Sequence, residues 1–365
     1  MTNIINKLKD RAVFRLKAFG GQVPRRLYDE LDYINDHGGA EALLLLSDLV
    51  RHLKSKGIYV GPGYGYAPCS LLCYGLGITD IDPVRWGLPF ERFTRSFKQE
   101  NSFTIETSEG GFEKAMAFLN ERCDYPVHLN PGNNLVIDIV FLDDPQFFNL
   151  HLGINCNTNL DIIKLLSKER TVKPSKIELD EKALKFFRDG ETRDIRGYSN
   201  PDHIQILMQF QPECFSDIYL LDALYRPETA AIIPEVTRRK NEYDIPSTGI
   251  AEVDSVLMES YGFLVYQEQA ILIEKILMRA EDSEATAKVR EMLDVPIKNL
   301  YPKGHAIART MQVVEMAYYK ARIPKQYAEI QKSERIRKIL VARTDRQNKI
   351  IREKLQSMNQ SNNQL

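Results

Sequence analysis

The chain has 365 residues, a hydrophobic fraction of 43%, a charged fraction of 27% and a formal net charge of −1. These values are typical of a globular protein, and they exclude a chain that is basic throughout, as many DNA-binding proteins are. The length suits two compact domains, or one large domain with a tail. The sequence has no apolar run near the length of a membrane span and no signal-peptide pattern. We therefore expect a cytoplasmic protein without a membrane partner.

The five cysteines are odd in number, and no two of them have the C-x-x-C spacing of a zinc or redox site. We expect free thiols, as is usual in a reducing cytoplasm. The histidines also lack the spacing of metal ligands, so the sequence predicts no zinc centre.

Two amphipathic helices are predicted in the first 57 residues. Pro24 begins the first, in which Leu27 and Ile34 lie on one face. The second spans about 41–56 and ends at Gly57, a residue type that favours the left-handed conformation found after helices.

A glycine-spaced loop follows these helices. Residues 58–60 are apolar and predict a short strand, and Gly61, Gly63 and Gly65 come directly after it. A strand, a glycine loop and a helix in this order can present backbone N–H groups to a phosphate. The three glycines are therefore candidate phosphate-binding residues.

The rest of the chain changes from strands to helices. A nearly continuous apolar run at 135–142 predicts a buried strand, and a shorter strand is expected over 149–154. Residues 165–200 are charged and rich in loops, so we place a domain boundary there. The pattern over 201–324 is mostly helical. Residues 325–365 predict one long charged helix with a disordered end, and residues 325–354 have ten Lys/Arg against four Asp/Glu.

Several strings of this sequence resemble the alpha subunit of bacterial DNA polymerase III, a C-family polymerase. They occur in the family's order, and together they are far more specific than any single one. The strings are IYVGPGYGYAPCSLLCYGLGITDIDPVRWGLPFERF at 58–93, LYRP at 224–227, YGFLVYQEQ at 261–269, KGHA at 303–306 and YKARIP at 319–324. The chain is identified as a truncated, degenerate homologue that covers the palm and fingers regions.

This resemblance implies an α+β fold. It would consist of a polymerase-beta-like palm with a small mixed sheet, a mostly helical fingers domain and a basic C-terminal helix. The expected divisions are 1–165 for the palm-like region, with the glycine loop at 61–70, 175–324 for the fingers-like region and 325–365 for the tail.

The metal ligands of the family are the main departure. Nucleotidyl transfer needs two divalent ions held by carboxylates. Aligned without a gap, the aspartates of the family's P-D-x-D-x-D strand fall on Phe103, Ile105 and Thr107. With a one-residue insertion they fall on Thr104, Glu106 and Ser108. The family's later aspartate falls on Gly153, so Glu106 is the only candidate remnant of the catalytic site.

The resemblance also assigns nucleotide or phosphate contacts to Ser70 and to the fingers. The fingers candidates are Arg226, Arg238, Arg239, Lys240, Arg290, Lys303 and His305. A scaffold role for these residues is equally open. Tyr64 and Tyr66 replace an arginine and a serine of the family's loop, and their rings either stack on a base or plug the pocket.

Three functions are compatible with these residues. The leading hypothesis is a catalytically inactive polymerase III alpha-like protein with a DNA-binding or replication-associated role and no cofactor. The first alternative is an active nucleotidyltransferase that uses Mg²⁺, Glu106 and a relocated carboxylate such as Asp138. The second is a protein-interaction scaffold that binds a partner through its basic tail and touches no nucleic acid.

Overall fold

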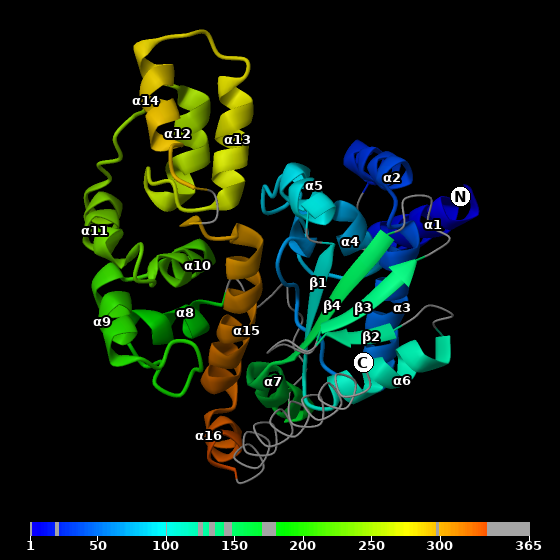
Figure 1. Cartoon of the computed structure of the whole chain (residues 1–365). Coiled ribbons are helices and arrows are strands. Elements are labelled where there is room, and N and C mark those ends of the chain that lie inside the picture. Colours follow the sequence, from blue (N-terminus) through cyan, green and yellow to red (C-terminus); the bar gives the residue numbers. More distant parts are fainter. Residues whose placement is uncertain are drawn as a thin grey trace, which may run out of the picture.

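The computed structural model describes residues 2–18, 22–99, 101–122, 127–130, 136–141, 148–169, 180–296 and 299–333. These residues form an α+β fold with one four-stranded mixed sheet in the first half and a helical second half (Figure 1). The fold class and the small mixed sheet are as predicted. Among the described helices, none is long and apolar enough to cross a membrane.

Helices surround the glycine loop and precede the sheet in the chain. They are α1 (Thr2–Ala18), α2 (Arg25–His37), α3 (Ala40–Ser55), η1 (Ala67–Cys69), α4 (Leu71–Leu76) and α5 (Phe90–Gln99). Helix α2 starts directly after Pro24 and buries Leu27 and Ile34, as the spacing predicts. Helix α3 ends next to Gly57, which has a φ of +71°. Both predicted helices are confirmed.

The strand predicted at 58–60 is wrong. Val60 pairs with Thr107 in an isolated antiparallel bridge, and no strand continues from it. The backbone N–H of Gly61 donates to the carbonyl oxygen of Glu106 at 2.8 Å. The backbone N–H of Ser108 donates to the carbonyl oxygen of Tyr59 at 2.8 Å, so the segment pairs with β1 only at the strand's last residues, which is too short for a strand of its own.

The sheet has the strand order β1-β4-β3-β2, with β1 parallel to β4 and the other pairs antiparallel. Its strands are β1 (Ser102–Thr107), β2 (Val127–Asn130), β3 (Val136–Phe141) and β4 (Phe148–Cys156). Strand β3 occupies the apolar run predicted to be a strand, and β4 contains the predicted 149–154 strand. Helix α6 (Gly111–Arg122) contacts β4 and α3.

The second half is helical, and helix α15 lies at its centre. The elements are α7 (Thr158–Glu169), α8 (Glu181–Arg188), α9 (Pro201–Phe210), α10 (Phe215–Leu224), η3 (Ala230–Ile232), α11 (Ile233–Glu242), α12 (Ala251–Leu257), η4 (Met258–Ser260), α13 (Gln267–Leu277), α14 (Glu284–Met292), α15 (Lys303–Arg322) and α16 (Pro324–Lys332). Figure 1 shows α15 between the sheet region and the helices α8 to α10. It contacts α7, α8, α10, α16 and η1, so it joins both halves of the molecule.

Hydrophobic side chains form one large cluster that runs from Leu8 to Tyr327, and a small second cluster between α12, α13 and α14. Helix α16 ends at Lys332, and Ser333 has an extended backbone, so the prediction of one continuous helix from 325 is wrong at this residue. The remainder of the predicted tail helix, from 334 to 365, lies outside the described residues, as does Cys123. The division into palm-like, fingers-like and tail regions stays a prediction.

Candidate functional site

Strand β1 presents Glu106 on its open face. Phe103, Ile105 and Thr107 are buried, whereas Thr104 and Glu106 are only half-buried. Side chains alternate between the two faces of a strand, so the buried set packs in the core and the other set faces outward. The gapless alignment would therefore put the family's aspartates into the apolar core.

Across the parallel ladder, Thr104 lies opposite Gly153 of β4, and Glu106 lies opposite Asn155. Paired residues on neighbouring strands share a face. Thr104, Glu106 and Gly153 are thus brought together, and Glu106 is the only carboxylate among the four residues.

Both carboxylate oxygens of Glu106 accept hydrogen bonds from side-chain amides. Asn157 Nδ2 donates to Oε1 at 3.1 Å, and Gln312 Nε2 donates to Oε2 at 2.9 Å. Asn157 Nδ2 also donates to Gln312 Oε1 at 2.9 Å. We call this triad of Glu106, Asn157 and Gln312 the amide clamp. It joins β1, the residue before α7 and the middle of α15.

The glycine loop passes over the clamp at Gly61. A Cβ atom at this position would lie 3.0 Å from Glu106 Cβ and 3.2 Å from its Oε2. A larger residue at this position would require Glu106 to shift. Gly63 is similarly constrained, because its Cβ would lie 2.6 Å from Thr79 Oγ1, whereas Gly65 has open space and a φ of +58°.

A cavity of about 300 Å³ borders the clamp. It is lined by Tyr64, Glu106, Asn157, Asn159, Arg196, Gly197, His305, Arg309, Gln312 and Val313. The rings of Tyr64 and His305 meet edge to face, with centroids 4.6 Å apart. Arg309 Nη2 lies 3.3 Å from the buried Asp222 carboxylate. Tyr64 thus forms one wall of the cavity and leaves space beside it.

His305 is neutral in this cavity at neutral pH. Burial, together with the nearby Arg309 guanidinium, lowers its pKa to about 4. Its Nδ1 atom is buried and has no hydrogen-bond partner in the described part of the protein. The predicted site residues Glu106 and His305 therefore face one cavity, which also contains two arginines.

Ser70 and the start of helix α4 are occupied by the chain itself. The Ser70 hydroxyl donates to Glu30 Oε2 at 2.7 Å and caps the N–H of Cys73. The backbone N–H groups of Leu71 and Leu72 also donate to the Glu30 carboxylate, at 3.0 and 2.9 Å. A helix N-terminus that could bind a phosphate here binds a buried glutamate.

The cations of helix α11 contact neighbouring groups of the chain. Arg238 pairs with Glu235 at 2.9 Å and with Asp244 at 2.9 Å. Arg239 pairs with Glu235 at 3.1 Å and lies over the ring of Phe263, 4.0 Å from its centroid. Both guanidinium groups are thus already engaged.

The other fingers cations are engaged in the same way. Lys240 is buried and pairs with Glu213 at 2.7 Å, and Arg290 pairs with Asp282 at 2.8 Å. Arg226 donates to two backbone carbonyl oxygens. These contacts favour the scaffold role that the sequence left open for these residues.

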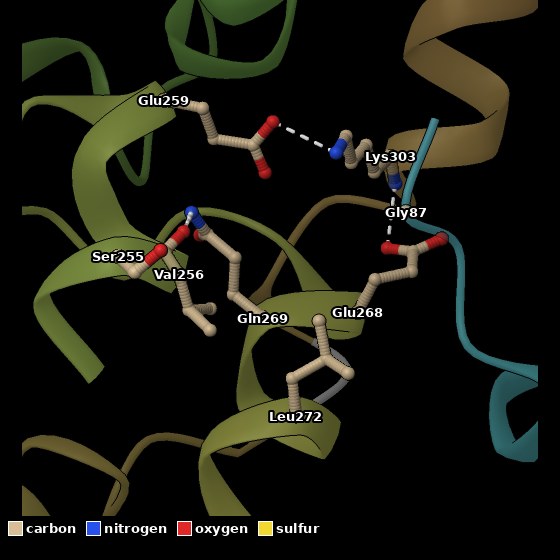
Figure 2. Close-up of a pocket in the computed structure, with 8 residues that line it drawn as sticks. All are labelled: Gly87, Ser255, Val256, Glu259, Glu268, Gln269, Leu272 and Lys303. Atoms are coloured by element: carbon tan, nitrogen blue, oxygen red, sulfur yellow. Dashed lines mark hydrogen bonds and ion pairs between the residues drawn. The ribbon is translucent and has the colours of Figure 1, made fainter. Parts of the chain in front are cut away.

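Lys303 lies in a second cavity, of about 230 Å³, shown in Figure 2. Its ammonium group contacts Glu259 at 2.7 Å and donates to the carbonyl oxygen of Trp86 at 2.8 Å. The Glu268 carboxylate accepts from the backbone N–H groups of Lys303 and Gly304, at 2.7 and 3.2 Å. Lys303 thus holds the start of α15 to the loop before α5, and Glu268 holds it to α13.

Asp138 is not close to Glu106. It pairs with His151 at 2.5 Å and lies opposite that residue in the β3–β4 ladder, and His151 in turn lies opposite Ser102 of β1. Ser102 is four residues before Glu106, which corresponds to about 13 Å along a strand. Within the described ranges, no three His, Cys, Asp or Glu side chains gather in a way that could hold a metal ion.

Sequence reasoning missed Asn157, Arg196, Arg309 and Gln312 as site residues. Arg309 and Gln312 lie four and seven residues after His305, so they share its face of α15. This spacing would have identified them from the sequence. Asn157 and Arg196 lie in connecting segments, where the sequence gives no such signal.

Comparison with known proteins places both halves of the chain in one family. Residues 3–102 match the description "Bacterial DNA polymerase III alpha NTPase domain", and residues 158–311 match "Bacterial DNA polymerase III alpha subunit finger domain". The two matches together span well over half of the chain.

Relatives with curated names agree with these matches. The DNA polymerase III subunit alpha of Aquifex aeolicus is 23% identical over an alignment that covers 84% of this chain and 38% of the relative. That of Mycobacterium leprae is 55% identical over 73 residues, which is 20% of this chain and 6% of the relative. An error-prone DNA polymerase of Cutibacterium acnes is 49% identical over 75 residues, again 20% of this chain and 6% of the relative.

The chain therefore spans between 6% and 38% of the length of these relatives. The matched regions include the glycine loop, the start of β1 and the part of α15 that carries His305 and Arg309. From these matches, the chain belongs to the family of the bacterial DNA polymerase III alpha subunit.

Proposed function

We propose that this protein is a catalytically inactive member of the DNA polymerase III alpha family with a DNA-binding, replication-associated role. One observation carries the proposal of inactivity. The alignment with a one-residue insertion and the family's later motif place aspartates at Thr104, Glu106 and Gly153. These three residues lie together on one face of the sheet, and only Glu106 is a carboxylate.

Mg²⁺ does not fit this set of side chains. A two-metal site needs several carboxylate oxygens around the ions. Here threonine and glycine stand at two of the aligned positions, and both oxygens of Glu106 already accept amide hydrogens. We therefore derive no step of nucleotidyl transfer from these residues.

The active alternative depends on a relocated carboxylate. Asp138 shares a face with Glu106, but it lies two strands away and is displaced by about 13 Å along the strand. Two catalytic metal ions are typically about 4 Å apart. The strand register therefore argues against this pair.

Support for DNA binding comes from family membership and from the cavity beside the clamp. The proposal keeps the palm-like region at 1–165 and the fingers-like region at 175–324, and the cavity has lining residues from both. Arg196 is exposed and makes no ion pair within the described residues. Arg309 adds a second guanidinium, although it is paired with Asp222, so Arg196 is the main candidate for a phosphate contact.

A protein-interaction scaffold is the second candidate. It is favoured by the ion pairs that engage Arg238, Arg239, Lys240 and Arg290, because paired cations attract a phosphate backbone less. Its partner would be a replication protein or another protein, bound without nucleic acid.

Primer extension tests the loss of catalysis. We expect no nucleotide incorporation by the purified chain on a primer–template duplex with Mg²⁺ or Mn²⁺. Incorporation that disappears in Glu106→Ala would overturn the proposal and restore the enzyme alternative.

Fluorescence anisotropy of a labelled primer–template duplex tests DNA binding. We expect binding at low salt that weakens steeply as salt rises, because bound cations are released from the phosphates. Arg196→Ala combined with Arg309→Ala should weaken binding, whereas Arg290→Ala serves as a matched control. No binding at low salt would reject the DNA-binding role and favour the scaffold.

A further inference from the structure

We infer that the side-chain amides of Asn157 and Gln312 take the place of a divalent cation at Glu106 and hold α15 to the sheet without a metal. The inference rests on the proposed function, because a catalytic metal site would require the same carboxylate to be free. It assigns a positioning role to two residues that the family resemblance does not mark.

The orientation of each amide in the clamp follows from hydrogen-bond chemistry. A backbone N–H can only donate, and that of Asn159 donates to Asn157 Oδ1 at 3.0 Å. Asn157 Nδ2 must then face Glu106 and Gln312. Because Gln312 Oε1 accepts from that nitrogen, Gln312 Nε2 faces the second carboxylate oxygen. Amide hydrogens therefore point at both oxygens of Glu106.

These hydrogens occupy positions that a cation would need. A metal ion binds carboxylate and carbonyl oxygens through their lone pairs. An ion placed at the clamp would meet N–H groups from two sides, and Gly61 covers a third side at close distance. Gln312 is only 2% exposed, so it has little room to turn away.

The charges around the clamp also oppose a cation. Arg196 and Arg309 line the same cavity as Glu106 and bring two positive groups to it. Asp222 is buried beside Arg309, and its pKa is raised by that burial, although Arg309 opposes the shift. With two arginines facing the Glu106 and Asp222 carboxylates, the cavity has no excess of negative charge that would concentrate divalent cations.

The clamp connects segments that are distant in the chain. Gln312 and Glu106 are 206 positions apart, and Asn157 belongs to the turn between β4 and α7. A coordinated ion would tie such segments together through several ligands. Here three hydrogen bonds do so, and the attachment of α15 to β1 does not depend on metal concentration.

The test converts the clamp into a cation site with the double variant Asn157→Asp, Gln312→Glu in the full chain. The aspartate keeps the oxygen that accepts from the Asn159 N–H. With EDTA, three carboxylates repel one another, so the melting temperature should fall. Saturating Mn²⁺ should raise it again, by about 3.5 °C at a concentration 100 times the Kd.

Two comparisons make this test decisive. The wild-type chain should show no change in melting temperature with Mn²⁺ or Mg²⁺, and adding Glu106→Gln to the double variant should remove the response. Mn²⁺ binding, followed by electron paramagnetic resonance, provides a readout independent of stability. If the double variant does not fold with EDTA, Gln312→Glu alone is measured in the same way.

Two results would overturn the inference. One is Mn²⁺ binding by the wild-type chain that is lost in Glu106→Gln. The other is a folded double variant, or the folded single variant, that binds no Mn²⁺. Both differ from a failure of the proposed function, which would appear as primer extension or as absent DNA binding by the wild-type chain.

Discussion

Glu30 and Glu106 are both saturated by hydrogen bonds, yet their surroundings differ. Glu30 is completely buried and accepts from the backbone N–H groups of Leu71 and Leu72 and from the Arg26 guanidinium. Glu106 is half-buried, accepts from neutral amides and borders a cavity. The comparison separates a carboxylate that is part of the buried scaffold from one that lies beside a cavity.

The largest effect is expected at Glu30. Glu30→Ala leaves two helix N–H groups and the Arg26 guanidinium without their buried partner, which costs about 3 kcal/mol or more in the free energy of unfolding. Urea denaturation measures it. Asp29→Ala, one residue away and exposed, is the control and should change stability by less than about 0.5 kcal/mol. A loss below about 1 kcal/mol for Glu30→Ala would mean that this buried carboxylate contributes little to stability, contrary to the comparison.

The second effect is a pH dependence at the Glu106 cavity. The pKa of His305 is lowered to about 4, from an ordinary value of 6.5. The unfolded chain therefore binds a proton between pH 6.5 and 4 that the folded chain does not bind. The contribution of His305 to the free energy of unfolding is complete above pH 6.5. It is lost as the pH falls from 6.5 to 4, by up to about 1.4 kcal/mol per pH unit.

Comparison with His305→Gln isolates this contribution. His203, with a pKa also near 4, and Glu315, with a pKa raised by burial to about 7, titrate in both proteins and cancel in the difference. Urea denaturation at pH 6.5, 5.5 and 4.5 gives the two curves. Parallel curves would show that His305 is accessible to protons in the folded chain.

A smaller effect is expected at the glycine that covers the clamp. The added methyl group of Gly61→Ala pushes against Glu106 and weakens the hydrogen bonds that its carboxylate accepts from the two amides. We expect the free energy of unfolding to fall by about 1–2 kcal/mol. In a Glu106→Ala background the same substitution should cost less, because the side chain that it meets is gone. A double-mutant cycle measures this coupling, and additive effects would argue that the loop and the clamp are independent.

The smallest effect is expected at Arg238. Its three acidic neighbours already engage it, so Arg238→Ala should leave the salt dependence of DNA binding unchanged. Arg196→Ala, at the cavity, should lower the slope of log binding constant against log salt by about 1, as the loss of one phosphate contact does. The reverse pattern would move the DNA contact away from the cavity.

The sequence predicted those features that depend on local periodicity. The apolar run of β3 and the helical face of α2 follow directly from the spacing of their apolar residues. The strand expected at 58–60 is reduced to one bridge, because Val60 pairs only with Thr107 at the end of β1, which lies 47 positions later in the chain. The pairing of Glu106 with Gln312 depends on tertiary packing, and no local pattern reports it.

The family strings predicted the family of the chain, but they did not predict which group each charged side chain contacts. Lys303 and Arg226 lie in matched strings, and both are bound to groups of the scaffold. A string fixes residue type and position, whereas the partner of a side chain depends on substitutions elsewhere in the chain. The amide clamp is such a case, because its two amides, from Asn157 and Gln312, lie outside the quoted strings.

Helices α12, α13 and α14 enclose a hydrophobic cluster of their own, separate from the main one. A small core that shares few side chains with its neighbour unfolds locally at a lower free energy than the whole domain does. Amide hydrogens of this unit should therefore exchange with solvent while α15 and the sheet remain protected. The molecule would then have two levels of rigidity, with a firm centre around α15 and an outer lobe that samples open states on its own.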